Sequence, residues 1–249
     1  MKKTIITGII EKPLIIESSQ FIVCQPHSTC ILVDMLKNDI KIHVKNNAEV
    51  FYVCMQKSGN KKARVEKNGK IHWIEIYTHN VETHTFTELL GINAHTTSTV
   101  FFVGNNTEKY KITHETIHKA KRTTSDITIF GTVTHANAYT FAKTIIEKKA
   151  YGAVAHQKLK TILLDDFATA SALPEMDIQN CDVQATHNAT VGHLKQEQLF
   201  YIMTRGINEK EAKRQIIYGH FTELLQRFND EIKIIIIKTL STKLGDPYV

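Results

Sequence analysis

The sequence predicts a mainly β protein, with a body of short strands followed by a small α-helical domain. Isoleucine (31), threonine (28) and valine (14) make up nearly three in ten of the 249 residues, and such β-branched side chains pack well on a pleated sheet. Short strand-like runs recur as far as about residue 185, and the apolar spacing becomes helical after residue 194. We therefore place the β body at 1–194 and the helical domain at 195–249.

The strand-like runs are separated by polar turns that contain few glycines and prolines. With eleven Gly and four Pro in the whole chain, Asn, Asp, His and Lys must build most of the turns. The runs 41–44 and 128–133 alternate cleanly between apolar and polar residues. The predicted strands are 4–10, 21–25, 30–35, 39–44, 49–55, 70–78, 99–103, 109–113, 126–133, 141–147 and 161–164.

Signals for β-hairpins are weak along this body. Asn68-Gly69 is a good two-residue turn and Asn105-Asn106 is a candidate. Most neighbouring runs lack such a link, and no crossover helices separate them. Regular short strands of this kind are typical of a sandwich, a barrel or a solenoid, and periodicity alone does not choose among the three.

Three helices are predicted after residue 194. The first, 196–204, is followed by Gly206, which can end a helix in the left-handed conformation. The second begins at Asn208, with Glu211 three residues later in a capping-box arrangement, and runs to about residue 228. The third runs from 231 to about 244. The apolar stripe of the second helix consists of Ala212, Ile216, Phe221, Leu224, Leu225 and Phe228.

Composition and charge exclude several classes of protein. Hydrophobic residues at 42% and charged residues at 22% exclude a disordered or collagenous chain. No apolar run approaches the roughly 18 residues of a membrane span, and no cleavage-like site follows the basic start. The net charge of +6 is spread along the chain, and its densest cluster, 119–122, has no nucleic-acid-binding motif beside it. We expect a soluble, cytoplasmic protein that binds neither nucleic acid nor membrane.

The four cysteines form no CxxC pair and no dense disulfide framework, which favours a reducing compartment. Cys24 and Cys30 could meet on neighbouring strands as a functional pair. The simpler interpretation is that both are small buried hydrophobic residues.

The chain has thirteen histidines, and two of their pairs invite a metal-binding interpretation. The odd spacing of His79 and His84 would point them to opposite faces of a strand. His114 and His118 would share a face but lie about 13 Å apart. Neither pair could hold one metal in this way, so we expect all four to be surface residues.

One composite stretch near the end of the β body is highly specific. Its main pieces are Pro174-Glu175-Met176-Asp177-Ile178, Cys181-Asp182-Val183, His187-Asn188-Ala189-Thr190-Val191-Gly192, Glu197-Gln198-Leu199-Phe200-Tyr201, Arg205-Gly206-Ile207 and Glu211-Ala212. Together they closely resemble the C-terminal signature of the SufB/SufD family of iron–sulfur cluster assembly proteins, and they are closer to the SufD pattern. The resemblance is strong from about residue 114 to 228.

The resemblance implies a right-handed parallel β-helix body and a C-terminal helical domain that docks the Suf ATPase, SufC. Two SufB/SufD-type subunits would pair through their β-helices, and a nascent cluster would form near the junction. The implied function is a non-catalytic, SufD-like scaffold subunit that binds no cofactor tightly, holds iron or a cluster transiently, and works with a cysteine desulfurase system. Typical members carry a long region before the β-helix, whereas strands here begin almost at Met1.

His187 is the candidate metal-binding residue, because the SufD pattern keeps this histidine and imidazole nitrogen can ligate iron. The cysteine and glutamate of the SufB pattern are absent, and Lys158 (or a near neighbour) and Asn188 stand in their places. His193 and Cys181 each lie six residues from His187 and could in principle add a ligand. Neither matches a family ligand, so we expect both to be structural.

The second predicted helix has more apolar positions than one narrow stripe needs. We expect the excess to form a docking face for the ATPase through Ile217, Phe221 and Leu225. Packing on a neighbouring helix is the alternative use of these positions, and both can hold.

Two other functions compete with the SufD-like one. A minimal self-pairing scaffold would serve as both SufB and SufD. A carbohydrate-active β-helix enzyme is remote, because it needs convergent acids and the signature stretch offers only Asp177 and Asp182 without an obvious partner. No Walker motif is present, so a partner must supply any ATP hydrolysis.

Overall fold

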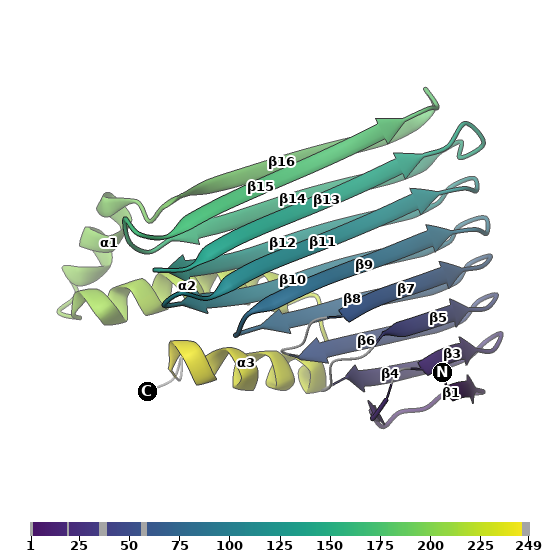
Figure 1. The fold of residues 1–249 in the computed structure, drawn as a ribbon, viewed down its shortest axis with the longest axis horizontal. Helices are drawn as coiled ribbons and strands as arrows, with labels where there is room; N and C mark the ends of the chain where they lie inside the picture. The colour runs from purple at the N-terminus through teal and green to yellow at the C-terminus, as the bar shows by residue number, and fades with distance from the viewer. Residues whose placement is uncertain (1, 19, 35–38, 56–58, 246–249) are drawn as a thin grey trace.

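The computed structural model describes residues 2–18, 20–34, 39–55 and 59–245. Within them the chain winds into a flattened solenoid of two parallel sheets, followed by three helices (Figure 1). One sheet, the odd sheet, has the order β1 (Lys2–Ile6), β3 (Gln20–Cys24), β5 (Ile40–Val44), β7 (Gly59–Val65), β9 (Val81–Leu89), β11 (Lys109–His118), β13 (Asn137–Ile146) and β15 (Thr169–Ile178). The other, the even sheet, has the order β2 (Leu14–Ile16), β4 (Thr29–Asp34), β6 (Glu49–Met55), β8 (Lys70–Tyr77), β10 (His95–Asn105), β12 (Thr124–Thr134), β14 (Ala153–Leu163) and β16 (Val183–His193).

The chain therefore alternates between the two sheets, and every pair of neighbouring strands in a sheet is parallel, as in the pair β13 and β15. This arrangement confirms the predicted parallel β-solenoid, in which each coil contacts only the coils before and after it.

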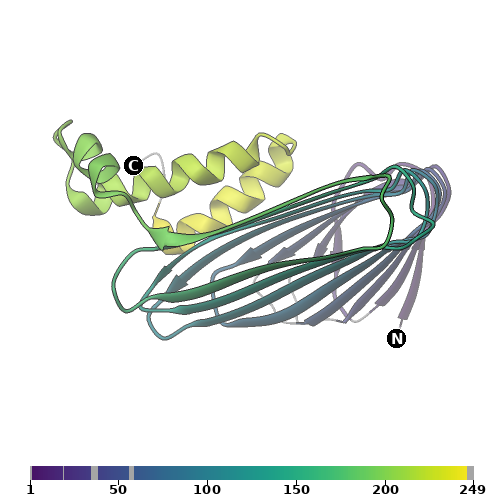
Figure 2. The ribbon, with the colours of Figure 1, turned by 90° about the horizontal axis from the view of Figure 1, so that it is seen from above.

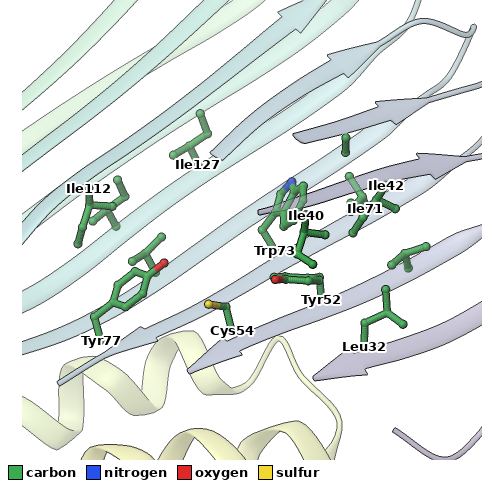
Figure 3. Packing of buried hydrophobic residues seen from close by; sticks show 14 of the residues in the cluster. Leu32, Ile40, Ile42, Tyr52, Cys54, Ile71, Trp73, Tyr77, Ile112 and Ile127 are labelled. Atoms are coloured by element: carbon green, nitrogen blue, oxygen red, sulfur yellow. The ribbon is translucent and has the colours of Figure 1, made fainter. Parts of the chain in front are cut away.

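Alternate side chains of each strand face the solenoid interior. In-register pairing places equivalent positions of successive coils side by side, so an inward row on one strand continues on the next. The inward rows of both sheets meet in one apolar core (Figure 3). Tyr52, Cys54, Trp73 and Tyr77 lie in this core and are at most 1% exposed.

Asparagines in the left-handed conformation mark many of the turns between coils. Asn68 has a φ of 54° and Asn106 a φ of 59°. Stacked turns are joined by side chains, since Asn93 Nδ2 donates to Asn68 Oδ1 at 2.9 Å. The turns expected at Asn68-Gly69 and Asn105-Asn106 are present, but they join strands of different sheets and do not close β-hairpins. Left-handed residues suit both kinds of turn, so the local signal does not distinguish them.

A charged cluster lies inside the solenoid. Lys61, Glu75 and His114 are at most 2% exposed. Lys61 Nζ lies 3.6 Å from Glu75 Oε2, and His114 Nε2 lies 3.3 Å from the same oxygen. Burial alone would raise the pKa of Glu75, but Lys61 and His114 hold it well below its ordinary value. The hydroxyl groups of Tyr77 and Thr85 each donate a hydrogen bond to this carboxylate at 2.6 Å. Hydrogen bonds and ion pairs within the protein therefore replace water around the buried charge.

The prediction that His114 and His118 are surface residues is wrong. Both face inward on β11, with exposed fractions of 1% and 0%. Each ring nitrogen of His118 lies 2.8 Å from a threonine or serine hydroxyl. Burial lowers the pKa of His118 to about 4. The i,i+4 spacing shows that the pair shares a face, but it does not show which face is inside.

The helices are α1 (Gln196–Met203), α2 (Glu209–Leu225) and α3 (Asp230–Leu244). The predicted cap is confirmed, since the side chain of Asn208 accepts the backbone N–H of Glu211. Asn229 caps α3 in the same way. Gly206, with a φ of 86°, follows α1 as expected. None of the helices in the described ranges is long and apolar enough to span a membrane.

Helices α2 and α3 lie across the outer face of the even sheet (Figure 2). Their apolar residues form one hydrophobic cluster with outward-facing residues of β4 to β14, including Phe101 and Phe130. The change from strand to helix falls between His193 and Gln196. The helices and the solenoid nevertheless share a core, because each covers apolar surface of the other.

Candidate functional site at the open end of the solenoid

The two sheets end at β15 and β16, which we call the open end. β15 pairs with β13, β16 pairs with β14, and no further strand pairs with either one among the described residues. One edge of each strand therefore presents backbone N–H and C=O groups without a strand partner. Such edges are the surfaces through which a sheet pairs with another chain.

Inward positions of the open end are exposed, although equivalent positions one coil earlier are buried. Ile146 of β13 is 0% exposed and its register partner Ile178 is 43% exposed. Thr161 of β14 is 1% exposed and its partner Val191 is 39% exposed. The open end thus has core-like side chains that no coil covers, and exposed apolar surface of this kind marks an interaction site.

His187 lies in the middle of this surface. It is an exposed residue near the centre of β16, and its register partner on β14 is Gln157, which is 2% exposed. Register partners in a parallel sheet point to the same side, so His187 belongs to the inward row. An imidazole at this place can reach a group held between the open end and a second chain.

The structure does not bring His193 or Cys181 to His187. His193 belongs to the same inward row but lies six residues further along β16, or about 20 Å. Cys181 is exposed in the turn before β16, and about 13 Å of strand separates that turn from His187. In the part of the chain that the structure describes, no three His, Cys, Asp or Glu side chains converge on one metal position. Of the three residues that the sequence suggested as ligands, His187 therefore stands alone in the middle of the open end.

Lys158 and Asn188 stand in the places of the SufB-pattern cysteine and glutamate. They are register partners on the neighbouring strands β14 and β16. Both belong to the outward rows, on the opposite side of the strand from His187. Lys158 Nζ lies 3.9 Å from Glu223 Oε1 of α2, and Asn188 Oδ1 accepts a hydrogen bond from Thr190. Neither contributes to the inward face of the open end.

The three remaining cysteines are inside the solenoid. Cys24 and Cys30 are 0% exposed and Cys54 is 1% exposed, which confirms that Cys24 and Cys30 are buried. The Cys24 and Cys30 side chains also meet inside the solenoid, where a hydrogen bond with Cys30 lowers the pKa of Cys24. Burial raises the pKa of Cys54 to about 12, so this thiol stays protonated and is a poor nucleophile and a poor sulfur acceptor.

The docking residues predicted on α2 are core residues in the structure. Ile217, Phe221 and Leu225 have exposed fractions of 2%, 0% and 6%. The Phe221 ring packs against Phe130 and Phe101 of the even sheet, with centroid distances of 4.8 and 5.6 Å. The excess apolar positions of α2 cover the even sheet, which corrects the prediction that these three side chains form a docking face.

Exposed aromatic residues gather instead on α1, which lies beyond the strand ends (Figure 1). Leu199 is the buried residue of this helix, whereas Phe200 is 70% exposed and Tyr201 is 59% exposed. The Arg205 guanidinium lies 5.3 Å from the centroid of the Tyr201 ring and donates to its hydroxyl at 3.1 Å. Aromatic and arginine side chains exposed together are typical of protein-binding surfaces.

Residues 17–220 match the protein family described as SUF system FeS cluster assembly, SufBD core domain. The match covers the solenoid from β3 to β16, all of α1 and most of α2. The chain belongs to the SufBD family. The strands of the open end, β15 and β16, and helix α1 all lie within the matched residues.

Relatives of the chain carry the name iron-sulfur cluster assembly SufBD family protein. Those of Staphylococcus haemolyticus (strain JCSC1435), Staphylococcus epidermidis (strain ATCC 35984) and Staphylococcus aureus (strain USA300) are each 29% identical to this chain over 192 residues. The alignments cover 72% of this chain and 41% of each relative. The chain therefore spans about two-fifths of the length of these relatives.

Proposed function

We propose that this SufBD family chain is a SufD-like scaffold subunit of an iron–sulfur cluster assembly complex, and that it pairs with a SufB/SufD-type subunit through its open end. The open end carries the proposal. It combines two free strand edges with an uncovered inward row, and an exposed histidine lies at its centre.

Pairing at the open end would meet two physical needs at once. The partner's strands would hydrogen-bond to the free edges of β15 and β16, and its side chains would cover residues such as Ile178 and Val191. Pro174 lies on β15 and has no N–H to donate. This gap in the row of donors restricts the registers in which a partner strand can pair.

Iron or a nascent cluster is the cargo of this junction in our proposal. Iron–sulfur clusters are held mainly by thiolates, and histidine can replace some of them. His187 would supply one nitrogen. Cys24, Cys30 and Cys54 are buried, and about 13 Å of strand separates the turn with the exposed Cys181 from His187, so the partner subunit would supply sulfur or carboxylate ligands.

We place the surface that binds a SufC-type ATPase on α1, with Phe200 and Tyr201 as its anchors. Both side chains are large and exposed, and Tyr201 is hydrogen-bonded to Arg205. Truncating an exposed anchor of this kind typically costs more than 1 kcal/mol of binding free energy. The chain itself has no Walker motif, so the ATPase would carry out the hydrolysis.

Matched variants of β15 test the pairing. The chain is co-expressed with a SufB/SufD-type subunit and the ATPase, purified anaerobically, and its stoichiometry is measured by native mass spectrometry. Ile178→Asp changes an inward residue that is 43% exposed, and Leu173→Asp changes an outward residue that is 46% exposed. We expect Ile178→Asp to abolish pairing and Leu173→Asp to leave it intact.

Equal behaviour of the two variants would show that the open end is not the interface. A wild-type chain that forms a stable homodimer, and that loses it only with Ile178→Asp, would favour the self-pairing scaffold over the SufD-like subunit. A chain that stays monomeric with every candidate subunit would refute both.

A further inference from the structure

Gln157 is a buried amide whose oxygen has no hydrogen-bond partner within the described residues. The side chain is 2% exposed, and Oε1 is buried and unsatisfied. Its nitrogen is used twice, since Nε2 donates to Thr144 Oγ1 at 2.8 Å and to the Glu175 carbonyl at 3.1 Å. A carbonyl can only accept, so the nitrogen must face Glu175, and the positions of nitrogen and oxygen are fixed.

A buried acceptor without a donor is unfavourable and rare in folded proteins. The register partners of Gln157 are Ile127 on β12 and His187 on β16. Ile127 has no donor. The inward residues of β15 beside Glu175 are Pro174 and Met176, whose side chains have no N–H or O–H either. Among these neighbours, His187 is the side chain that can donate.

We propose that Gln157 is a positioning residue for the His187 imidazole. One ring N–H of His187 donates to Gln157 Oε1, and the other nitrogen is left unprotonated and free at the open end. Neighbouring strands in a sheet lie about 4.8 Å apart, so a change in the side-chain torsion angles of the exposed histidine is enough to make this contact. The inference rests on the proposed role of His187 as an iron ligand.

The consequence of this hydrogen bond is a fixed tautomer. The hydrogen bond made by one nitrogen of a histidine determines which nitrogen is free to bind a metal. Histidines that bind metals nearly always donate their other N–H to an oxygen, and losing that oxygen typically weakens metal binding about 10–100-fold. Gln157 Oε1, which has no other donor, can accept the second N–H of His187 already in the metal-free chain.

Two substitutions separate positioning from a merely structural role. Gln157→Met and Gln157→Glu both remove the N–H donors to Thr144 and Glu175, so both lose these two hydrogen bonds. Gln157→Glu keeps an acceptor oxygen for His187, whereas Gln157→Met does not. Thr161→Val is the control, because Thr161 also has a buried orphan oxygen but its register partner is Val191, which has no side-chain donor.

Long-range ¹H–¹⁵N NMR correlations of the full, metal-free chain read the tautomer of neutral His187 directly. We expect a single tautomer in wild type, Gln157→Glu and Thr161→Val, and a mixture in Gln157→Met. Titration with Co²⁺, followed on the His187 ring resonances, should show about 10–100-fold weaker binding in Gln157→Met than in Gln157→Glu.

A tautomer mixture in the wild-type chain would overturn the inference, even if Gln157→Met fails to fold. Identical spectra for Gln157→Met and Gln157→Glu would overturn it as well. The NMR experiment involves neither the partner subunit nor the ATPase. A fixed tautomer in a chain that fails to pair would therefore refute the proposed function and leave the hydrogen bond established.

Discussion

Replacing Phe221 by alanine tests whether α2 is part of the core of the solenoid. The Phe221 ring is 0% exposed and packs against Phe130, Phe101 and Tyr218, at centroid distances of 4.8, 5.6 and 6.5 Å. The substitution leaves a cavity between α2 and the even sheet. Truncations of this kind cost about 3–5 kcal/mol. The three aromatic contacts keep Phe221→Ala above the lower end of that range, at about 4 kcal/mol.

Chemical denaturation with two probes measures this effect. The chain has one tryptophan, Trp73, which is buried inside the solenoid, so its fluorescence reports on the β body. Circular dichroism at 222 nm reports mainly on the helices. Because α2 and the even sheet share one hydrophobic cluster, we expect both signals to shift to lower denaturant. A loss of about 4 kcal/mol should also lower the melting temperature by roughly 8–16 °C.

Phe200→Ala is the matched control, because Phe200 is 70% exposed on α1. Exposed substitutions usually change stability by less than about 0.5 kcal/mol, so this variant should fold normally and lose ATPase binding. The reasoning is refuted if Phe221→Ala costs less than about 1 kcal/mol and lowers ATPase binding. A shift of the helical signal alone would show that the helices fold independently of the solenoid.

Three further predictions follow from the histidines and cysteines. His187→Ala should keep the chain folded but lower the iron recovered with the anaerobic complex, whereas His193→Ala should do neither; equal iron content in the two variants would contradict the assignment. The unfolded chain protonates His118 near pH 6.5 and the folded chain near pH 4, so the unfolded state binds more protons between these values. The free energy of unfolding should therefore decrease by up to about 3 kcal/mol as the pH falls from 6.5 to 4, and denaturation curves of His118→Gln should lack most of this decrease. In the native chain iodoacetamide should modify Cys181 long before the buried Cys24, Cys30 and Cys54, and mass spectrometry that finds early label on a buried thiol would contradict the closed core.

Two strands that the sequence failed to predict, β7 and β9, have threonine or other polar residues where an apolar row is expected. In β9 the inward row is Val81, Thr83, Thr85 and Thr87, all at most 4% exposed. β7 contains the buried Lys61, which the internal charged cluster satisfies. β4, β6 and β8 are rich in aliphatic and aromatic residues and were predicted as strands. Hydrophobic alternation therefore misses β7 and β9, because part of the interior of each strand is hydrogen-bonded and not apolar.

The helical region shows a different limit of the sequence. Its three helices and the Asn208 cap are determined by local chemistry, which a single segment contains. What covers an apolar helix face depends on a distant part of the chain. Phe221 meets Phe101 and Phe130, which lie about a hundred residues earlier, so the apolar excess of α2 was assigned to a partner and not to the even sheet.

The candidate site depends both on a local sequence pattern and on contacts between strands that are distant in the chain. The signature stretch identifies His187, but only the register with Gln157 shows that the ring belongs to an inward row. A comparison with His118 shows why the position at the open end matters. In a closed coil, the surrounding hydroxyls occupy both ring nitrogens of His118, which leaves no nitrogen for a metal. His187 occupies the same kind of inward position in the last described coil, where the coil below offers one orphaned acceptor and no coil lies above. Of His118 and His187, only the histidine at the open end can therefore keep a ring nitrogen free for a metal.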